Sequence, residues 1–419
     1  MNPMPLVLAM LRRDVGTSAA FVALIALAVG LAAAITSQER ALRSGSARAA
    51  DKFDLIVAAP GSQTDVLLRV VFLQPGSVEL LQGEPLRRLM SEARAEFVAP
   101  VGFGDSYRGN PVVGTTAALV DHLASGRLEG RSFIAIDEAV VGAASPLGIG
   151  ESFQVTHGHG EEAFLGDQHG QTVSVVGRLP ATGSPWDRAV IVPIEFVWDV
   201  HGLGTGHGAV PPQGEEGAGA PEAHEEHPSA IGPPFDLATL PGIPAAVLKP
   251  ATLADAYGLR GEWRTSETMA FFPAEVLVEL YELLGNMRAV MSGLAIATEL
   301  LLVGAILCGI LILMRLYRHR FAILRALGAS RLYVFAVAWC FAFVLIAGGS
   351  VIGLGVAAGI TGIVSALFAQ ASGIALDSGI GWTEAGLAAA VAAIGALLAI
   401  VPAALLYREP VVSALRGAA

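Results

Sequence analysis

Seven of the nine histidines in this chain lie between residues 157 and 227. They are His157, His159, His169, His201, His207, His224 and His227. A neutral imidazole binds zinc and similar metals, and the neighbouring residues Glu161, Glu162, Glu225 and Glu226 would add oxygen ligands. The pattern has two interpretations. It is either a weak zinc site, centred on His157, His159 and His169, or a solvated low-complexity loop with no bound metal.

Other catalytic patterns are missing from the sequence. The run His224-Glu225-Glu226-His227 is one residue shorter than the H-E-x-x-H of zinc proteases and is followed by Pro228. A P-loop needs Gly-Lys followed by Ser or Thr, but the only two lysines, Lys52 and Lys249, precede Phe53 and Pro250. No Ser-His-Asp spacing, haem motif or dinucleotide fingerprint stands out. The chain is therefore not expected to be an enzyme, and any ATP that drives it must bind to another subunit.

A second concentration of chemistry is the basic segment 315–331. It holds five arginines and no acid: Arg315, Arg318, Arg320, Arg325 and Arg331. Between them the apolar residues Phe321, Ile323, Leu324, Ala326 and Leu327 recur at helical spacing. The pattern predicts a short amphipathic helix with Gly328 as its C-cap. Such a helix would lie on a lipid surface or dock on a partner.

Composition indicates a membrane protein with a soluble part. The 419 residues are 53% hydrophobic and only 15% charged, with a mean hydropathy of +0.60. Four apolar runs are long enough to cross a bilayer, at residues 15–35, 291–314, 332–368 and 384–406. The first has a second interpretation, a secretory signal. The net charge of −11 argues against a nucleic-acid partner.

The basic segment lies between two of these runs, so it is expected on the cytoplasmic side. Residues 1–14 and the tail 407–419 are then cytoplasmic as well, while residues 36–287 and the short loop 369–383 are outside. Arg12, Arg13, Arg408 and Arg416 fit this orientation. Four basic residues at the other end of the first span count against it: Arg40, Arg43, Arg48 and Lys52.

The outer region 36–287 mixes strand-like runs such as FDLIVAA, AVIVPI and TVSVVG with the helix-like run VELLQGEPLRRLMSEARA. This mixture predicts an α/β or α+β domain. Residues 201–234 differ, because Gly, Pro, Ala and Glu dominate without periodicity, and they are expected to form a flexible insertion.

Some polar and small residues of the spans allow specific interpretations. Glu299 is either a functional buried carboxylate or a residue facing the outer headgroups. Cys308 and Cys340 are interpreted as small core residues. The third span is longer than a bilayer requires, so it either bends at its glycines or continues beyond the bilayer. Its glycines would also let the helix pack closely against another.

Several runs resemble the MacB/FtsX/LolC-type permeases of ABC transporters. The strongest is Ala322-Ile323-Leu324-Arg325-Ala326-Leu327-Gly328-Ala329-Ser330. Others are residues 53–62, 138–142 with 147–150, 182–188, and Pro410-Val411 with Ala414-Leu415-Arg416. One departure is plain: that family usually has an acid two positions before the matched Ala322, where this chain has Arg320.

The resemblance implies a multi-pass permease of a bacterial inner membrane, with a large periplasmic domain. It implies a homodimer docked on a cytoplasmic ATPase subunit that holds the ATP, and a periplasmic adaptor or substrate-binding protein. ATP-driven closure would pass mechanically through the spans to a periplasmic substrate or partner. The coupling surface would be formed by Arg318, Phe321, Ile323, Leu324, Arg325, Ala326, Leu327 and Gly328. Two alternatives share these features: an FtsX-like signalling protein that regulates a periplasmic enzyme, and a protein linked to zinc or other metal handling.

Overall fold

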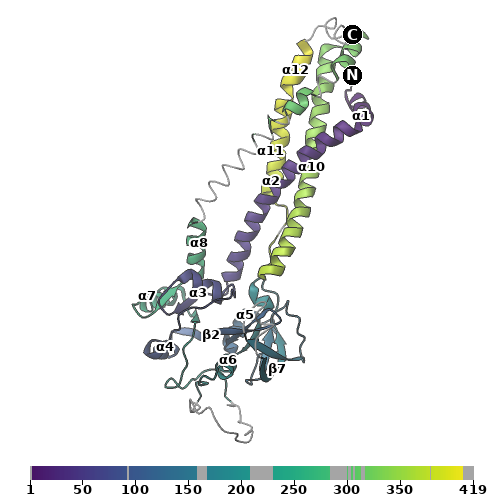
Figure 1. The fold of residues 1–419 in the computed structure, drawn as a ribbon. Helices are drawn as coiled ribbons and strands as arrows, with labels where there is room; N and C mark the ends of the chain where they lie inside the picture. Colours follow the sequence, from purple (N-terminus) through teal and green to yellow (C-terminus); the bar gives the residue numbers. More distant parts are fainter. Residues whose placement is uncertain are drawn as a thin grey trace. The chain divides into compact units, whose positions relative to one another are not determined.

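The computed structural model describes residues 2–91, 94–157, 168–207, 230–283, 300, 303–304, 307–312, 317–377 and 379–408. The chain forms two compact units (Figure 1). The helical unit comprises Met1–Arg43, Leu284–Leu367 and Leu376–Ala419. The globular unit comprises Ser44–Leu283 and Phe368–Ala375.

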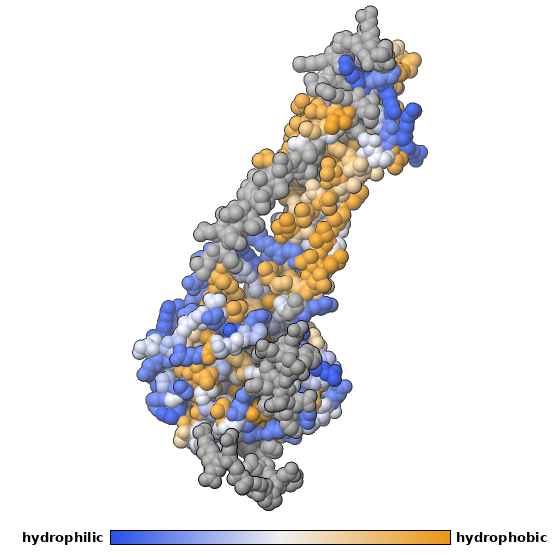
Figure 2. Space-filling model, in the orientation of Figure 1, coloured by the Kyte–Doolittle hydropathy of each residue, from blue (hydrophilic) through white to orange (hydrophobic). Residues whose placement is uncertain are grey.

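Long apolar helices dominate the helical unit. Its named helices are α1 (Met4–Arg13), α2 (Val15–Ala50), α10 (Arg331–Ser372), α11 (Trp382–Leu398) and α12 (Ile400–Arg408). Three described stretches are long and apolar enough to cross a membrane: Val15–Ala50, Arg331–Gln370 and Trp382–Ala404. Hydrophobic residues run along these helices in Figure 2, and hydrophilic residues are frequent over the globular unit. The second predicted span, 291–314, lies mostly outside the described residues, as does Glu299.

Two of the helices exceed what a bilayer requires. With 36 residues in α2 and 42 in α10, a rise of 1.5 Å per residue gives lengths of about 54 Å and about 63 Å. The hydrocarbon core of a bilayer is about 30 Å thick. The third predicted span therefore continues past the hydrocarbon as an unbroken helix, which decides between the two alternatives posed by its length. The first continues as far as Ala50.

Glycines let α2 and α10 approach closely. A Cβ on Gly349 would lie 2.7 Å from Cβ of Ile25, and one on Gly353 would lie 2.9 Å from the Ala26 carbonyl oxygen. The two glycines are four residues apart, so they share one face of α10. The predicted close packing is thus confirmed for these two positions. At Gly355, in contrast, an added Cβ meets nothing within 4 Å.

A buried carboxylate pairs with one of the arginines that counted against the orientation. The Arg40 guanidinium lies 3.3 Å from Glu384, a fully buried residue in the first turn of α11, and donates to the Gly379 carbonyl at 2.6 Å. Glu384 also accepts from the Gly381 amide at 2.8 Å. Arg40 therefore has a structural role at this end of α2, which explains a basic residue there without a change of topology.

The globular unit is built on ten strands, most of them antiparallel. They are β1 (Leu55–Ala58), β2 (Ala95–Tyr107), β3 (Asn110–Thr115), β4 (Glu129–Gly130), β5 (Glu138–Val141), β6 (Ser152–His157), β7 (Gln168–Arg178), β8 (Val190–Pro193), β9 (Ala245–Pro250) and β10 (Met269–Phe271). The pairing order is β10-β1-β9-β2-β3-β8-β5-β7-β4. Because β6 pairs with both β2 and β7, the strands β2, β3, β8, β5, β7 and β6 close into a ring. The long strand β2 belongs both to this ring and to the sheet with β9, β1 and β10.

Each part of the strand framework has its own hydrophobic core. The ring encloses a core that includes Val155, Val173 and Val190, whereas the open sheet packs against Leu86 of α4 and Leu259 of α7. Helix α6 (Ile194–Val200) contributes Phe196 to the first core and Trp198 to the second. The remaining helices are α3 (Gln63–Val70), α4 (Gly83–Met90), α5 (Ala117–Ala124), the 3₁₀ turn η2 (Pro185–Arg188), α7 (Leu253–Glu262) and α8 (Pro273–Leu283).

The mixed strand and helix domain predicted after the first span is confirmed, and the three strand-like runs lie in β1, β7 and β8. The helix-like run starting at Val78 is helical only in α4, because Leu81 bridges to Ile243 and Ala95 already begins β2. The interpretation of both cysteines as core residues is wrong for Cys308, which is exposed, while Cys340 is half-buried.

Candidate functional site

The basic segment forms the short helix that its spacing predicts. Residues 317–326 are helical. Gly328 follows with φ of +98°, and the Ala329 amide donates to the Leu324 carbonyl while the Gly328 amide donates to the Arg325 carbonyl. These two bonds are those of a Schellman C-cap. The prediction that Gly328 ends the helix is confirmed.

One face of this helix is buried in the helical unit. Tyr317, Phe321 and Ala322 are almost fully buried, in a core shared with Val7 and Met10 of α1. Leu324 is half-buried against the same core. Phe321 and Leu324, both predicted coupling residues, therefore fix the helix in place from its inner side.

The opposite face is apolar and exposed. Ile323 is 43% exposed, Leu327 80% and Leu332 71%. We call these three residues the exposed apolar face. Ala326 and Gly328 are exposed beside it, and Arg318 and Arg325 are partly exposed. An apolar surface bordered by arginines suits a partner with an apolar groove and acidic residues at its rim.

A polar cluster attaches the basic segment to the start of α2. The Asp14 carboxylate accepts from the Arg320 guanidinium at 2.6 Å and from the Tyr317 hydroxyl at 2.8 Å. The Arg320 guanidinium also lies 4.9 Å from the centre of the Tyr317 ring. The hydrogen bonds from Arg320 and then Tyr317 lower the pKa of Asp14. Burial, followed by the bond to Asp14, raises the pKa of Tyr317 to about 12.

The predicted metal residues are only partly within the described residues. His159, His224 and His227 lie outside them, and His157 and His169 belong to β6 and β7. His201 follows α6, with Nδ1 at 2.7 Å from the Val197 carbonyl oxygen. Within the described ranges, no group of three or more His, Cys, Asp or Glu residues lies close enough to hold a metal ion.

His207 contacts a buried carboxylate of the globular unit. Its Nε2 lies 3.1 Å from Oε1 of Glu195, which is 1% exposed, and the same oxygen accepts from the Gly232 amide at 2.6 Å. One buried carboxylate therefore binds both ends of the 208–229 stretch. Burial is the main cause that raises the pKa of Glu195, against hydrogen bonds that lower it. His207 and Gly232, which the sequence places within the expected flexible insertion, thus both contact a buried residue of α6.

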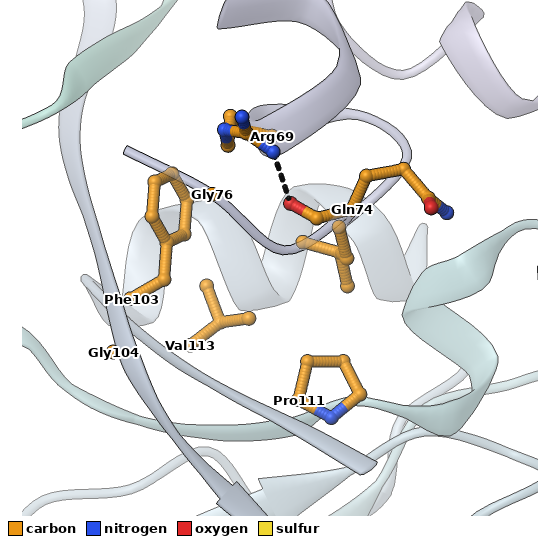
Figure 3. A pocket seen from close by; sticks show the side chains of 8 residues that line it. Arg69, Gln74, Gly76, Phe103, Gly104, Pro111 and Val113 are labelled. Atoms are coloured by element: carbon orange, nitrogen blue, oxygen red, sulfur yellow. Dashed lines mark hydrogen bonds between the residues drawn. The ribbon is translucent and has the colours of Figure 1, made fainter. Parts of the chain in front are cut away.

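A small pocket lies over the β2–β3 hairpin (Figure 3). Arg69 from α3 closes one side by donating to the Gln74 carbonyl at 3.0 Å. Phe103, Pro111 and Val113 line the strand side. Its volume of about 40 Å³ accommodates a few waters rather than a metabolite. The pocket is not a candidate substrate site.

Comparison with known proteins gives a likeness for the globular part. The chain is similar to the periplasmic region of MacB from Actinobacillus actinomycetemcomitans, at 10% identity and a TM-score of 0.32, over 56% of this chain and 95% of that one. It is also similar to the extracellular domain of the noncanonic ABC-type transporter YknZ from Gram-positive bacteria, at 11% identity and a TM-score of 0.27, over 52% and 98%. No family model and no curated protein matches the chain.

Two functional partners were missed at the sequence level. Asp14 is the only acid in the first 38 residues, and the basic segment has none. This imbalance was a usable signal for their pairing. Glu195 gave no signal, because its role depends on two backbone segments that meet only in the folded chain.

Proposed function

We propose that this chain is the membrane subunit of an ATP-driven ABC system of the MacB type. The observation that carries the proposal is the exposed apolar face on a short, capped and firmly anchored helix. This helix immediately precedes α10, the longest apolar helix among the described residues, and Leu332 of the face is the second residue of α10. A soluble partner that covers Ile323, Leu327 and Leu332 removes apolar surface from water, which stabilises a complex by about 1.5–3 kcal/mol for a fully buried Leu.

The anchoring makes this surface suitable for transmitting force. The helix is held by its buried face, by the Gly328 cap and by the Asp14 cluster. Only Gly328, Ala329 and Ser330 separate the end of the capped turn from Arg331, the first residue of α10. A displacement of the helix by a partner would therefore move α10 as well, because the connection between them is only three residues long.

The partner in this proposal is a cytoplasmic ATPase subunit, since neither lysine of the chain fits a P-loop. The chain itself would be non-catalytic and would work as a homodimer, with both termini in the cytoplasm and the globular unit outside the inner membrane. ATP hydrolysis would act mechanically on an outer substrate or partner. An FtsX-like signalling role uses the same surface, and co-purification of an outer hydrolase instead of an adaptor would identify it.

The test is co-purification. The chain is expressed with each ATPase encoded near its gene, and recovery is compared for wild type, Leu327→Asp and Leu253→Asp. Leu253 is the matched control, because it is 76% exposed on α7 of the globular unit. Leu324 is less suitable, because a charge there would disturb the core.

One ATPase should co-purify with wild type and with Leu253→Asp, and its recovery with Leu327→Asp should fall by about tenfold or more. The reason is that burying an unpaired carboxylate costs several kcal/mol. Unchanged melting temperatures of both variants would show that the fold is intact. Equal recovery of the ATPase with both variants, or recovery of none with wild type, would contradict the proposal.

A further inference from the structure

The turn at residues 182–188 lies against the final turn of α10. The segment Phe368–Ala375 belongs to the globular unit, although the rest of α10 belongs to the helical one. The Gly183 carbonyl accepts from the Ala375 amide at 3.1 Å, and the Arg188 guanidinium donates to the Gln370 carbonyl at 2.6 Å. Two hydrogen bonds thus join the turn to the α10 end, one on each side of the helix terminus.

Close backbone contact accompanies these bonds. Gly373 ends α10 with φ of +73°, and a Cβ there would lie 3.0 Å from Cα of Pro185. A Cβ on Gly183 would lie 3.6 Å from Cβ of Ala375. From the other side, Arg48 near the end of α2 donates to the Ala375 carbonyl at 3.3 Å. The α10 end is therefore held by both the globular turn and α2.

The turn itself is built to be rigid. The buried Asp187 carboxylate accepts from the Thr182 amide at 2.7 Å, the Thr182 hydroxyl at 2.7 Å and the Gly183 amide at 2.8 Å. Trp186 is fully buried and donates from its indole nitrogen to the Val70 carbonyl at 3.1 Å. These contacts fix the turn to the core, so it does not need the α10 end to hold its shape.

The turn also leads directly into the strand framework. It is followed by β8, which pairs with β3 on one side and β5 on the other. A force on Gly183 or Arg188 would thus act on β8, a strand that is paired on both sides, and not on a peripheral loop.

We infer that the 182–188 turn is a mechanical joint that grips the outer end of α10 and transfers its movement to β8. This inference rests on the proposed function for the source of movement, but the grip itself does not. Arg188 is a positioning residue of the joint. Residues Arg331–Ser372 form one continuous helix, so α10 connects the basic segment to this joint along the chain.

The first test is a disulfide that needs no ATPase. Cys308 and Cys340 are replaced by alanine in the full chain, and Gly183→Cys is combined with Ala375→Cys. The 3.6 Å separation matches the Cβ separation of disulfides. Most of the double variant should cross-link under mild oxidation in the membrane, with the single-cysteine variants as controls. No cross-link in a folded double variant, together with fast hydrogen exchange at 368–376 in the otherwise native chain, would overturn the joint.

The second test measures transfer through the joint. Hydrogen exchange is followed in nanodiscs with the bound ATPase, with and without ATP and vanadate. Wild type and the control Arg127→Gln, an exposed arginine of the same unit, should show nucleotide-dependent exchange in 317–328 and in 182–193. Arg188→Gln should keep the first change and lose at least half of the second.

The outcomes separate the two claims. If Arg188→Gln retains the full change at 182–193, transfer through the joint is wrong although the proposed function stands. If wild type shows no nucleotide-dependent change anywhere while the disulfide still forms, the proposed function is wrong and the grip on α10 stands.

Discussion

At the scale of single residues, Asp14 and Arg320 show how this chain departs from the family pattern that it resembles. Arg320 occupies the position where those permeases usually carry an acid, and Asp14 at the start of α2 supplies the opposite charge. The two residues of this pair are 306 positions apart in sequence. It therefore fixes the basic segment to the first membrane helix.

This assignment predicts a charge-swap rescue. Arg320→Glu should lower the melting temperature by a few degrees, because it places two carboxylates together. Asp14→Arg should do the same by pairing two guanidinium groups. The double variant should recover most of the loss, as measured by thermal unfolding in detergent. Additive losses in the double variant would show that the two residues do not interact.

Glu195 predicts a pH effect with a definite sign. Burial raises its pKa in the folded chain, so the folded state binds more protons than the unfolded state above pH 4.5. Its contribution to stability is present below that pH and is lost as the pH rises through the raised pKa. The melting temperature of Glu195→Gln should therefore rise relative to that of wild type as the pH increases above 4.5.

The control for this prediction is Glu151→Gln, because Glu151 is exposed. Its difference from wild type should stay flat over the same range. A Glu195→Gln difference that is flat, or that falls with rising pH, would show that the carboxylate is not held by burial as described.

At the scale of elements, the α2–α10 contact depends on two small residues. Gly353→Val should destabilise the helical unit by about 1–3 kcal/mol, because the new side chain overlaps the backbone of α2. Gly355→Val is the matched control, since an added Cβ there meets nothing within 4 Å. Thermal unfolding in detergent compares them. Equal melting temperatures would mean that the two helices do not pack at Gly353.

The helices were predicted well from the sequence where a long apolar run or a regular spacing of apolar residues marks them. Apolar runs located α2, α10 and α11, and helical spacing with Gly328 located the short basic helix. The C-terminal end of α2 was not predicted, because the polar residues Gln38 and Arg40 look like the end of a span. In the structure they stay helical, with Gln38 donating to the Thr361 carbonyl at 3.0 Å and Arg40 paired with Glu384. Tertiary contacts, rather than composition, extend α2.

The candidate site was predicted in part for a similar reason. Residues 317–328 were recognised by motif and periodicity, but periodicity alone did not show which apolar side chains remain exposed. Phe321 faces the core and Leu327 does not, and this follows from packing against α1, a helix the sequence analysis did not predict. The contact between His207 and Glu195 could not be predicted from the sequence either, because it depends on the fold of the globular unit.

At the scale of the whole molecule, α10 is the element that links the basic segment to the strand framework. In the proposed function the exposed apolar face would receive a partner, and the 182–188 turn is hydrogen-bonded to the end of α10. No step in this sequence requires a tunnel or a catalytic centre. We propose that a separate ATPase acts on the exposed apolar face.

The most direct measurement of that claim is the ATP hydrolysis rate of the co-purified ATPase. The rate is measured for the ATPase alone, with the wild-type chain in nanodiscs, and with Leu327→Asp in nanodiscs. We expect wild type to change the rate and Leu327→Asp to return it to the value of the ATPase alone. An equal change with wild type and with a folded Leu327→Asp variant would contradict coupling through the exposed apolar face.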